Sequence, residues 1–292
     1  MEENVRKLVS LIINFVEEKK TTFFVIIVVI CVIALVIGIY SQFFYKNSDV
    51  DPFMLGINIG SKKTAEEYAE LKTNFLNLFT NELHINSESI RIDKIETSQS
   101  IVYSGYLIEN EDEAYYSVDL TLPILNIDNE NAKEINAEIK SEFYDNATKI
   151  MRSSSSYTIY QVSYVAYVNE NIVSIVIKEN SKTGNEAETT KIKTYTYDIS
   201  SNEEVSLSKL IELKETTEEE VQEDIDSSIE TAYENAKAIA NEYGSTVTRD
   251  PDDDMYEIEN SDDYFLTDDG YVYIIYDYGE DSNTNEMDII IF

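Results

Sequence analysis

The stretch 157–179 reads YTIYQVSYVAYVNENIVSIVIKE and decides the fold. β-Branched and aromatic residues dominate it, and such residues are typical of strands. It predicts two long strands, 157–169 and 171–179, joined by a short turn that favours antiparallel pairing. A third strand is expected at 191–199, beyond a polar turn around Gly184.

Strands and helices alternate on both sides of this stretch. Further strands are expected at 90–95, 101–108, 115–125, 264–266, 271–278 and 287–292. Helical spacing of apolar residues predicts helices at 64–83, 132–151, 205–213 and 218–243. The order indicates an α+β protein with mostly antiparallel sheets packed by helices, preceded by one transmembrane helix.

Tyrosine is abundant, with 22 residues, and tryptophan is absent. Many tyrosines fall in expected strands, such as Tyr157, Tyr160 and Tyr273. We interpret them as half-buried strand residues. An aromatic platform that binds carbohydrate is the alternative.

The run 23–39 contains seventeen residues without a charge or a strongly polar side chain. A helix over 22–45 would be roughly 35 Å long, enough to cross a hydrocarbon core of about 30 Å. A buried core helix or a cleaved signal peptide is the alternative, but no A-x-A cleavage pattern ends the run. The run predicts an uncleaved signal anchor embedded in the lipid bilayer.

The flanking charges orient this anchor. Arg6, Lys7, Lys19 and Lys20 precede it, so the positive-inside rule places segment 1–21 in the cytoplasm. Apolar residues at helical spacing make this segment an amphipathic helix, which would lie on the inner membrane surface or bind a partner. Beyond the anchor we expect a juxtamembrane linker, helix and first strands over 46–110, and an extracellular domain over 111–292.

The charge is strongly acidic, at −35 overall. Acids and bases balance in the first twenty residues, so the excess belongs to the exported part. Such a surface repels nucleic acid and attracts a cationic partner, although the acidity could serve solubility alone. The one cysteine, Cys31, lies within the apolar run, so the exported part contains no disulfide.

Residues that build common active sites are missing, and we therefore expect neither an enzyme nor a cofactor. His84 is the only histidine, and we interpret it as a surface residue. One histidine without cysteine cannot form the usual zinc site or a catalytic triad in a G-x-S-x-G context. No glycine-rich phosphate-binding motif is present. The many carboxylates make a catalytic pair impossible to single out.

An acidic loop offers one candidate metal site. Asp250, Asp252, Asp254 and Glu257 resemble the opening of a calcium-binding loop. Met255 occupies the position that requires glycine, so the segment is not an EF-hand. A solvated acidic loop is our interpretation, with weak calcium binding as the alternative.

Several short motifs resemble a known exported domain. These motifs are TLPIL at 121–125, NAKEINAEI at 131–139, TYTYD at 194–198, EVSLSKLI at 204–211 and YFLTDDGYVY at 264–273. The chain is similar here to the C-terminal domain of unknown function that the anti-sigma-V factor RsiV shares with PdaC-type peptidoglycan deacetylases. The catalytic domain of those deacetylases has no counterpart here.

The resemblance implies an extracellular sensor, because the anti-sigma factor's domain binds lysozyme. Segment 1–21 is shorter than the sigma-binding region of such factors and offers little surface for a specific interface. We expect a single-pass, membrane-anchored extracytoplasmic binding or sensor protein of a Gram-positive type of bacterium. Its ligand would be a cationic wall-active protein such as lysozyme. The alternative is a structural envelope protein that contacts cell-wall polymers without signalling.

Overall fold

The chain divides into two units, Met1–Leu55 and Gly56–Phe292. The computed structural model describes residues 62–86, 95–244, 247, 250–278 and 286–292, all in the second unit. The expected cytoplasmic segment 1–21 and membrane anchor 22–45 lie outside the described residues, as does most of the expected strand 90–95. Among the helices that are described, none is both long and apolar enough to cross a membrane.

A large sheet is built around the stretch that the sequence singles out. It contains β4 (Thr158–Asn169), β5 (Ile172–Thr183) and β6 (Thr189–Asp198), which pair antiparallel in chain order. The β4–β5 turn is so tight that Glu170 takes a positive φ of 53°. β7 (Glu203–Glu204) adds two residues beyond β6. The three predicted central strands are confirmed.

Two strands pair with β4 in parallel. β2 (Val102–Asp112) and β3 (Tyr116–Leu125) form the predicted hairpin, and β3 then pairs parallel with the first half of β4. β1 (Glu82–Ile85) pairs parallel with the second half. A parallel neighbour requires a crossover, which the helices between β3 and β4 provide. Antiparallel pairs still dominate, and the α+β class is confirmed.

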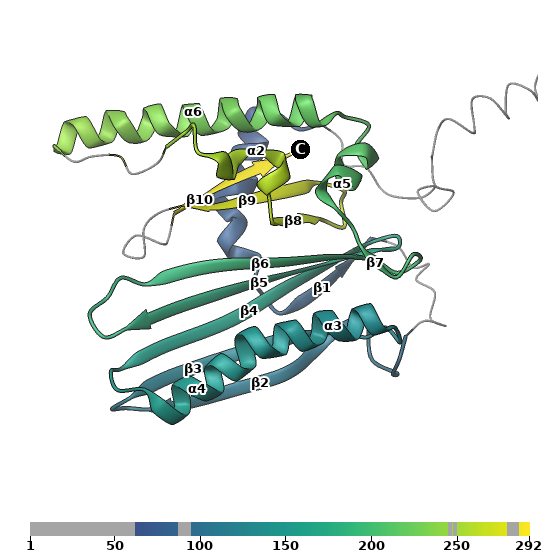
Figure 1. Ribbon diagram of the computed structural model, residues 1–292, viewed down its shortest axis with the longest axis vertical. Helices are drawn as coiled ribbons and strands as arrows, with labels where there is room; N and C mark the ends of the chain where they lie inside the picture. Colours follow the sequence, from purple (N-terminus) through teal and green to yellow (C-terminus); the bar gives the residue numbers. More distant parts are fainter. Residues whose placement is uncertain (1–61, 87–94, 245–246, 248–249, 279–285) are drawn as a thin grey trace, which may run out of the picture. The chain divides into compact units, whose positions relative to one another are not determined.

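The crossover covers one face of the large sheet (Figure 1). It consists of α3 (Glu130–Ile139), a π-helical turn η4 (Lys140–Tyr144) and α4 (Asp145–Ser153). Ile135, Ile139 and Phe143 are buried against the sheet, as their spacing predicts. Residues spaced four apart drift around an α-helix, because the helix has about 3.6 residues per turn. One wider π-helical turn offsets this drift and keeps the three side chains on the face that contacts the sheet.

A second sheet lies on the opposite face. It contains β8 (Asp263–Leu266), β9 (Val272–Tyr278) and β10 (Glu286–Ile291) in the order β10-β9-β8. Hydroxyl groups of the large sheet bond to the backbone of β8. Thr194 Oγ1 accepts from Tyr264 N at 2.9 Å, and Ser174 Oγ accepts from Leu266 N at 3.1 Å. Side chains of the large sheet thus accept hydrogen bonds from backbone N–H groups of β8.

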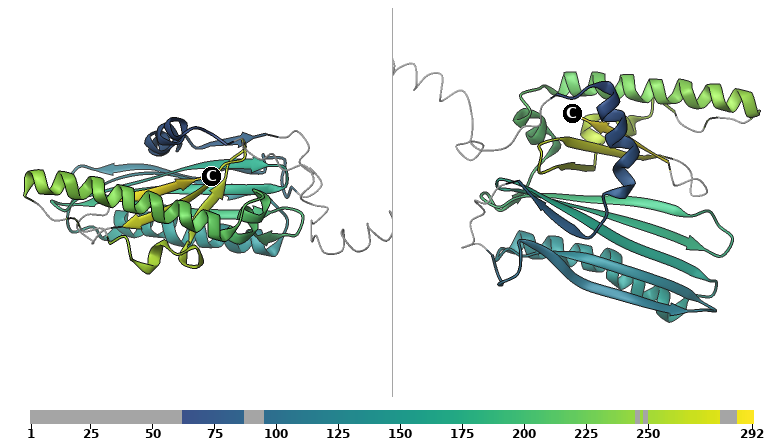
Figure 2. Two further views of the ribbon diagram at one scale, coloured as in Figure 1. Left: turned by 90° about the horizontal axis from the view of Figure 1, so that it is seen from above. Right: turned by 180° about the vertical axis from the view of Figure 1, so that it is seen from behind.

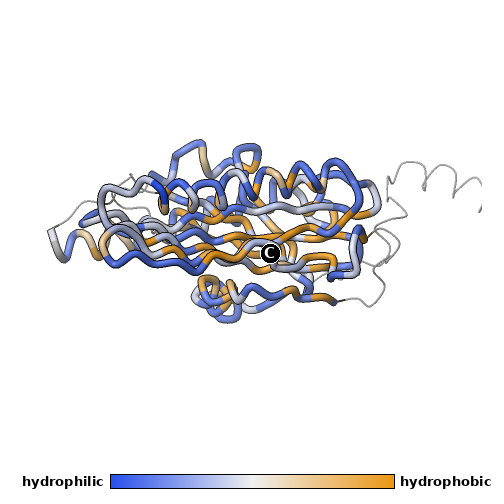
Figure 3. Tube along the Cα trace, turned by 90° about the horizontal axis from the view of Figure 1, so that it is seen from below, coloured by the Kyte–Doolittle hydropathy of each residue, from blue (hydrophilic) through white to orange (hydrophobic). Residues whose placement is uncertain are grey.

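Aromatic rings fill the space between the two sheets. Phe265 stacks on Tyr273 with ring centroids 4.7 Å apart and on Tyr167 at 5.7 Å. Phe75 joins them from η2 (Phe75–Asn77), which follows α2 (Ala65–Asn74). Figure 2 shows α2 running from the level of α6 towards the large sheet, and Figure 3 shows hydrophobic residues gathered along the strands.

The helix expected at 64–83 begins correctly and ends early. Thr64 and Glu67 form the predicted capping box at its start. The prediction was wrong beyond Asn77, because β1 takes up residues 82–85 of this segment. β1 precedes residue 111 and β2 spans it, and both belong to the same sheet as the strands that follow.

Two helices and two short turns complete the unit. α5 (Leu207–Leu213) and α6 (Glu218–Tyr243) match the predicted helices. The 3₁₀ turns η5 (Asp254–Tyr256) and η6 (Ile258–Asn260) precede β8. The early apolar positions of α6, Val221 and Ile225, are buried, whereas Ile239 near its end is 60% exposed.

Candidate functional site: an acidic groove beside α5 and α6

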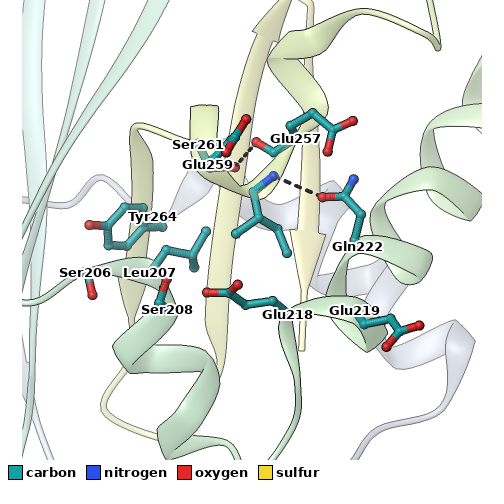
Figure 4. Close-up of a pocket in the computed structure, with 11 residues that line it drawn as sticks. Ser206, Leu207, Ser208, Glu218, Glu219, Gln222, Glu257, Glu259, Ser261 and Tyr264 are labelled. Atoms are coloured by element: carbon teal, nitrogen blue, oxygen red, sulfur yellow. Dashed lines mark hydrogen bonds between the residues drawn. The ribbon is translucent and has the colours of Figure 1, made fainter.

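A groove with a volume of about 570 Å³ opens between the starts of α5 and α6 and the loop that contains η6 (Figure 4). Eight of the eleven residues that line it carry a hydroxyl or carboxylate group. The residues that set its chemistry are Ser206, Ser208, Glu218, Glu219, Glu257 and Glu259. Leu207 and Ile258 add apolar contact area.

Helix starts form one wall of this acidic groove. Ser206 caps α5, since its side chain accepts from Lys209 N at 3.3 Å. Thr217 caps α6 in a reciprocal box with Glu220. This cap places Glu218 and Glu219 in the first turn, where the helix dipole stabilises negative charge. The local sequence therefore fixes the backbone position of both residues.

The loop 257–261 forms the other wall, and buried groups fix it at both ends. Tyr256 donates its hydroxyl to Asp288 Oδ2 at 3.2 Å. Ser261 Oγ lies 2.7 Å from Tyr276 OH. Burial raises the pKa of Tyr276 to about 12, so this hydroxyl keeps its proton at neutral pH. Glu257 and Glu259 are thus presented from a fixed segment.

Gln222 ties the two walls together. Its Oε1 accepts from Ile258 N at 3.0 Å, and its Nε2 donates to Tyr256 O at 3.0 Å. The same amide nitrogen donates to Asp226 Oδ1 at 2.8 Å. One side chain of α6 therefore holds the loop in register with the helix, as Figure 4 shows for the bond to Ile258.

No ion pair of the described residues compensates the charge of the groove. Within the described part of the chain, the ion pairs join lysines to acids elsewhere, such as Lys133 to Glu130 and Lys209 to Glu212. None of them involves Glu218, Glu219 or the carboxylates of the loop. Such a site can hold ammonium or guanidinium groups, because carboxylates and hydroxyls accept charge-assisted hydrogen bonds.

The candidate calcium residues do not come together in the groove. Glu257 lines it, whereas Asp250, Asp252 and Asp254 do not. Asp250 Oδ1 instead accepts from Asp252 N at 3.1 Å, which closes a local turn. Among the residues the structure describes, no three or more His, Cys, Asp or Glu side chains are grouped to hold a metal ion.

His84 lies on β1, away from the groove. Its half-buried ring stacks on Tyr167 with centroids 5.3 Å apart. Tyr157 is half-buried as predicted, whereas other strand tyrosines are more deeply buried, with Tyr160, Tyr164 and Tyr197 no more than 2% exposed. Tyr264 is the one that lines the groove, and its hydroxyl donates to Val205 O at 3.1 Å.

Sequence reasoning missed most of the groove. Thr217 and Glu220 form a box that marks a helix start, and that signal could have placed Glu218 and Glu219. No local pattern could have placed Gln222 beside Ile258, because their 36-residue separation is bridged only in three dimensions.

Comparisons with known proteins give distant likenesses. No family model matches the sequence, and no curated protein matches it significantly. The crystal structure of a DUF3298 family protein from Pseudomonas aeruginosa PAO1 is similar at 13% identity and a TM-score of 0.24, over 34% of this chain and 50% of that one. This chain thus spans half the length of that protein.

A DUF3298 member from Bacteroides fragilis NCTC 9343 is similar at 12% identity and a TM-score of 0.26, over 56% of this chain and 74% of that one. DUF3298 is the domain found in RsiV and PdaC-type proteins. At these scores neither neighbour indicates what this chain binds.

Proposed function

We propose that this chain is a non-enzymatic, membrane-anchored extracytoplasmic binding or sensor protein, and that its acidic groove captures a cationic wall-active protein such as lysozyme. The observation that carries the proposal is the groove itself. Four carboxylates, Glu218, Glu219, Glu257 and Glu259, line one cavity on a braced frame without ion-pair partners in the described residues.

The frame matters because binding to fixed groups requires little reorganisation. Gln222 and the buried Tyr256 hold the loop wall in place before any ligand arrives. A lysine or arginine side chain that enters the groove meets preformed acceptors, and Leu207 and Ile258 contact its aliphatic stem. The net charge of −35 would speed the encounter.

The anchor completes the proposal. The apolar run 23–39 and the basic residues before it support a single span with the groove outside the cell. An acidic domain held near the outer face of the cell membrane would meet cationic proteins that reach the cell envelope.

A titration with lysozyme across a salt series tests this function. Nonspecific attraction between exposed charges disappears when salt is raised, because the screening length at physiological ionic strength is only about 8 Å. A built site retains affinity near 0.15 M salt, which is the expected result. Loss of all binding at that concentration would refute capture of lysozyme and favour a structural envelope protein that contacts wall polymers.

A further inference from the structure

The outer edge of β2 is a second surface with unused binding capacity. β2 is 11 residues long and pairs with β3 from Val102↔Leu125 to Asp112↔Tyr116. In the part of the chain that the structure describes, no strand pairs with its other edge. Figure 1 shows β2 at the margin of the large sheet, on the far side from α6.

Other strand edges in the described residues are short or covered. β7 has only two residues. The backbone of β8 is bonded by Thr194 and Ser174, and β10 contacts α2 and α6. A long uncovered edge is a template on which another chain can add a strand.

β2 lacks most of the features that protect edges from such pairing. Its one irregularity, between Ser104 and Tyr106, lies near its start. The remainder, YLIENED, contains neither proline nor lysine. Its exposed acids, Glu109, Glu111 and Asp112, oppose pairing with a second copy, because carboxylates would then face carboxylates.

The same acids favour a cationic strand. Glu109 lies directly opposite Asp119 of β3, and like charges in that position are destabilising. Glu111 follows on the same face of the hairpin. The ion pairs of the described chain include none of these three side chains. A lysine or arginine beside Glu109 on an added strand would relieve this repulsion.

We infer that the outer edge of β2 binds an extended, cationic segment of a partner protein by strand addition. Main-chain hydrogen bonds to the edge supply affinity, and basic side chains at alternate positions select Glu109 and Glu111. This surface shares no residue with the acidic groove and does not depend on the function proposed for it.

A backbone-modified peptide tests the inference on the full chain. The probe is a capped peptide of alternating lysine and threonine, about eight residues long to match a strand. Two control peptides carry N-methyl groups, one on the threonine amides and the other on the lysine amides. Each control keeps the charge of the parent peptide and removes the backbone N–H donors on one side of the strand. We expect the parent peptide to bind near 0.15 M salt and at least one N-methylated form to lose about tenfold in affinity.

Charge reversals then locate the site. E109K/E111K should weaken binding roughly tenfold, since it replaces attraction with repulsion at two adjacent positions. E223K/E230K on the exposed side of α6 changes the net charge equally and should have little effect. Hydrogen exchange should slow at 106–112 when the peptide binds. The inference would be overturned if the parent peptide did not bind, or if both N-methylated peptides bound as tightly as the parent. Equal losses of affinity in E109K/E111K and E223K/E230K would overturn it as well.

Discussion

Gly105 lies in the irregular step of β2, between Ser104 and Tyr106. A Cβ built at this position would overlap the side chain of Ile124 on β3. The absence of a side chain therefore lets the two strands approach each other, which is one of the specific uses of glycine in a sheet.

Replacing this glycine should destabilise the hairpin. We expect Gly105→Ala to lower the free energy of unfolding by about 1–3 kcal/mol, the usual cost of overpacking. Urea denaturation measures the change. Combining it with Ile124→Ala should give less than the sum of the two single effects, because the colliding atoms are then gone. Additive losses would show that the overlap is not the cause.

Two carboxyl groups between the large sheet and the second sheet have raised pKa values. Burial raises the pKa of Asp263, which accepts from Thr194 N at 2.8 Å. Loss of hydration, with a smaller contribution from the charge of Asp263, raises the pKa of Asp277 to about 6, although part of the Asp277 side chain reaches solvent.

The protein should consequently be more stable in mild acid. The folded-state pKa of Asp277 lies above its ordinary value of 3.8, so the folded state binds a proton that the unfolded state releases. Stability from this group is gained as pH falls through about 6 towards 4 and is lost as pH rises. Asp277→Asn should raise the melting temperature at neutral pH. It should also reduce the difference in melting temperature between about pH 6 and about pH 4. A wild-type melting temperature that falls steadily over this range would contradict the assignment.

Gln222 shows how one helix can position a loop far along the chain. Gln222→Ala removes partners from Ile258 N and Tyr256 O, and we expect a loss of about 1–2 kcal/mol in unfolding free energy. Hydrogen exchange at Ile258 should accelerate. Gln222→Glu keeps the acceptor for Ile258 N but sets a carboxylate oxygen against Tyr256 O and Asp226 Oδ1, so it should be at least as destabilising as alanine. Unfolding free energies of both variants equal to that of the wild type would show that these bonds contribute nothing.

Elements with a strong periodic pattern, and neighbours joined by a short turn, were predictable from the sequence, whereas partners distant along the chain were not. β4, β5 and β6 follow from runs of β-branched and aromatic residues, and α6 follows from Thr217 and the apolar repeat. β1 is only four residues long, too short for a pattern, and its parallel partner is about eighty residues away. The groove depends on such long-range pairing, so the sequence alone placed only Glu257 among the candidates.

The topology that we propose for the whole chain rests on charge and hydropathy alone. With segment 1–21 inside and the acidic unit outside, protease added to intact, wall-stripped cells should remove nearly all of the protein and leave a small membrane-bound stub. Immunoblotting with antibodies to both ends measures this outcome. Protection of the acidic unit until the membrane is permeabilised would reverse the orientation.

Net charge and local arrangement make different predictions for the complete molecule. If the charge of −35 alone attracted a cationic protein, any two carboxylates would contribute equally. If the groove is the site, its own carboxylates should dominate, because they line one cavity with a braced wall.

The affinity of lysozyme for two matched variants near 0.15 M salt separates these cases most directly. E257Q/E259Q removes two charges from the groove, and E223Q/E230Q removes two from the exposed side of α6. The groove variant should bind roughly tenfold more weakly, and the α6 variant should stay within about twofold of the wild type. Equal losses in both variants would contradict capture by the groove.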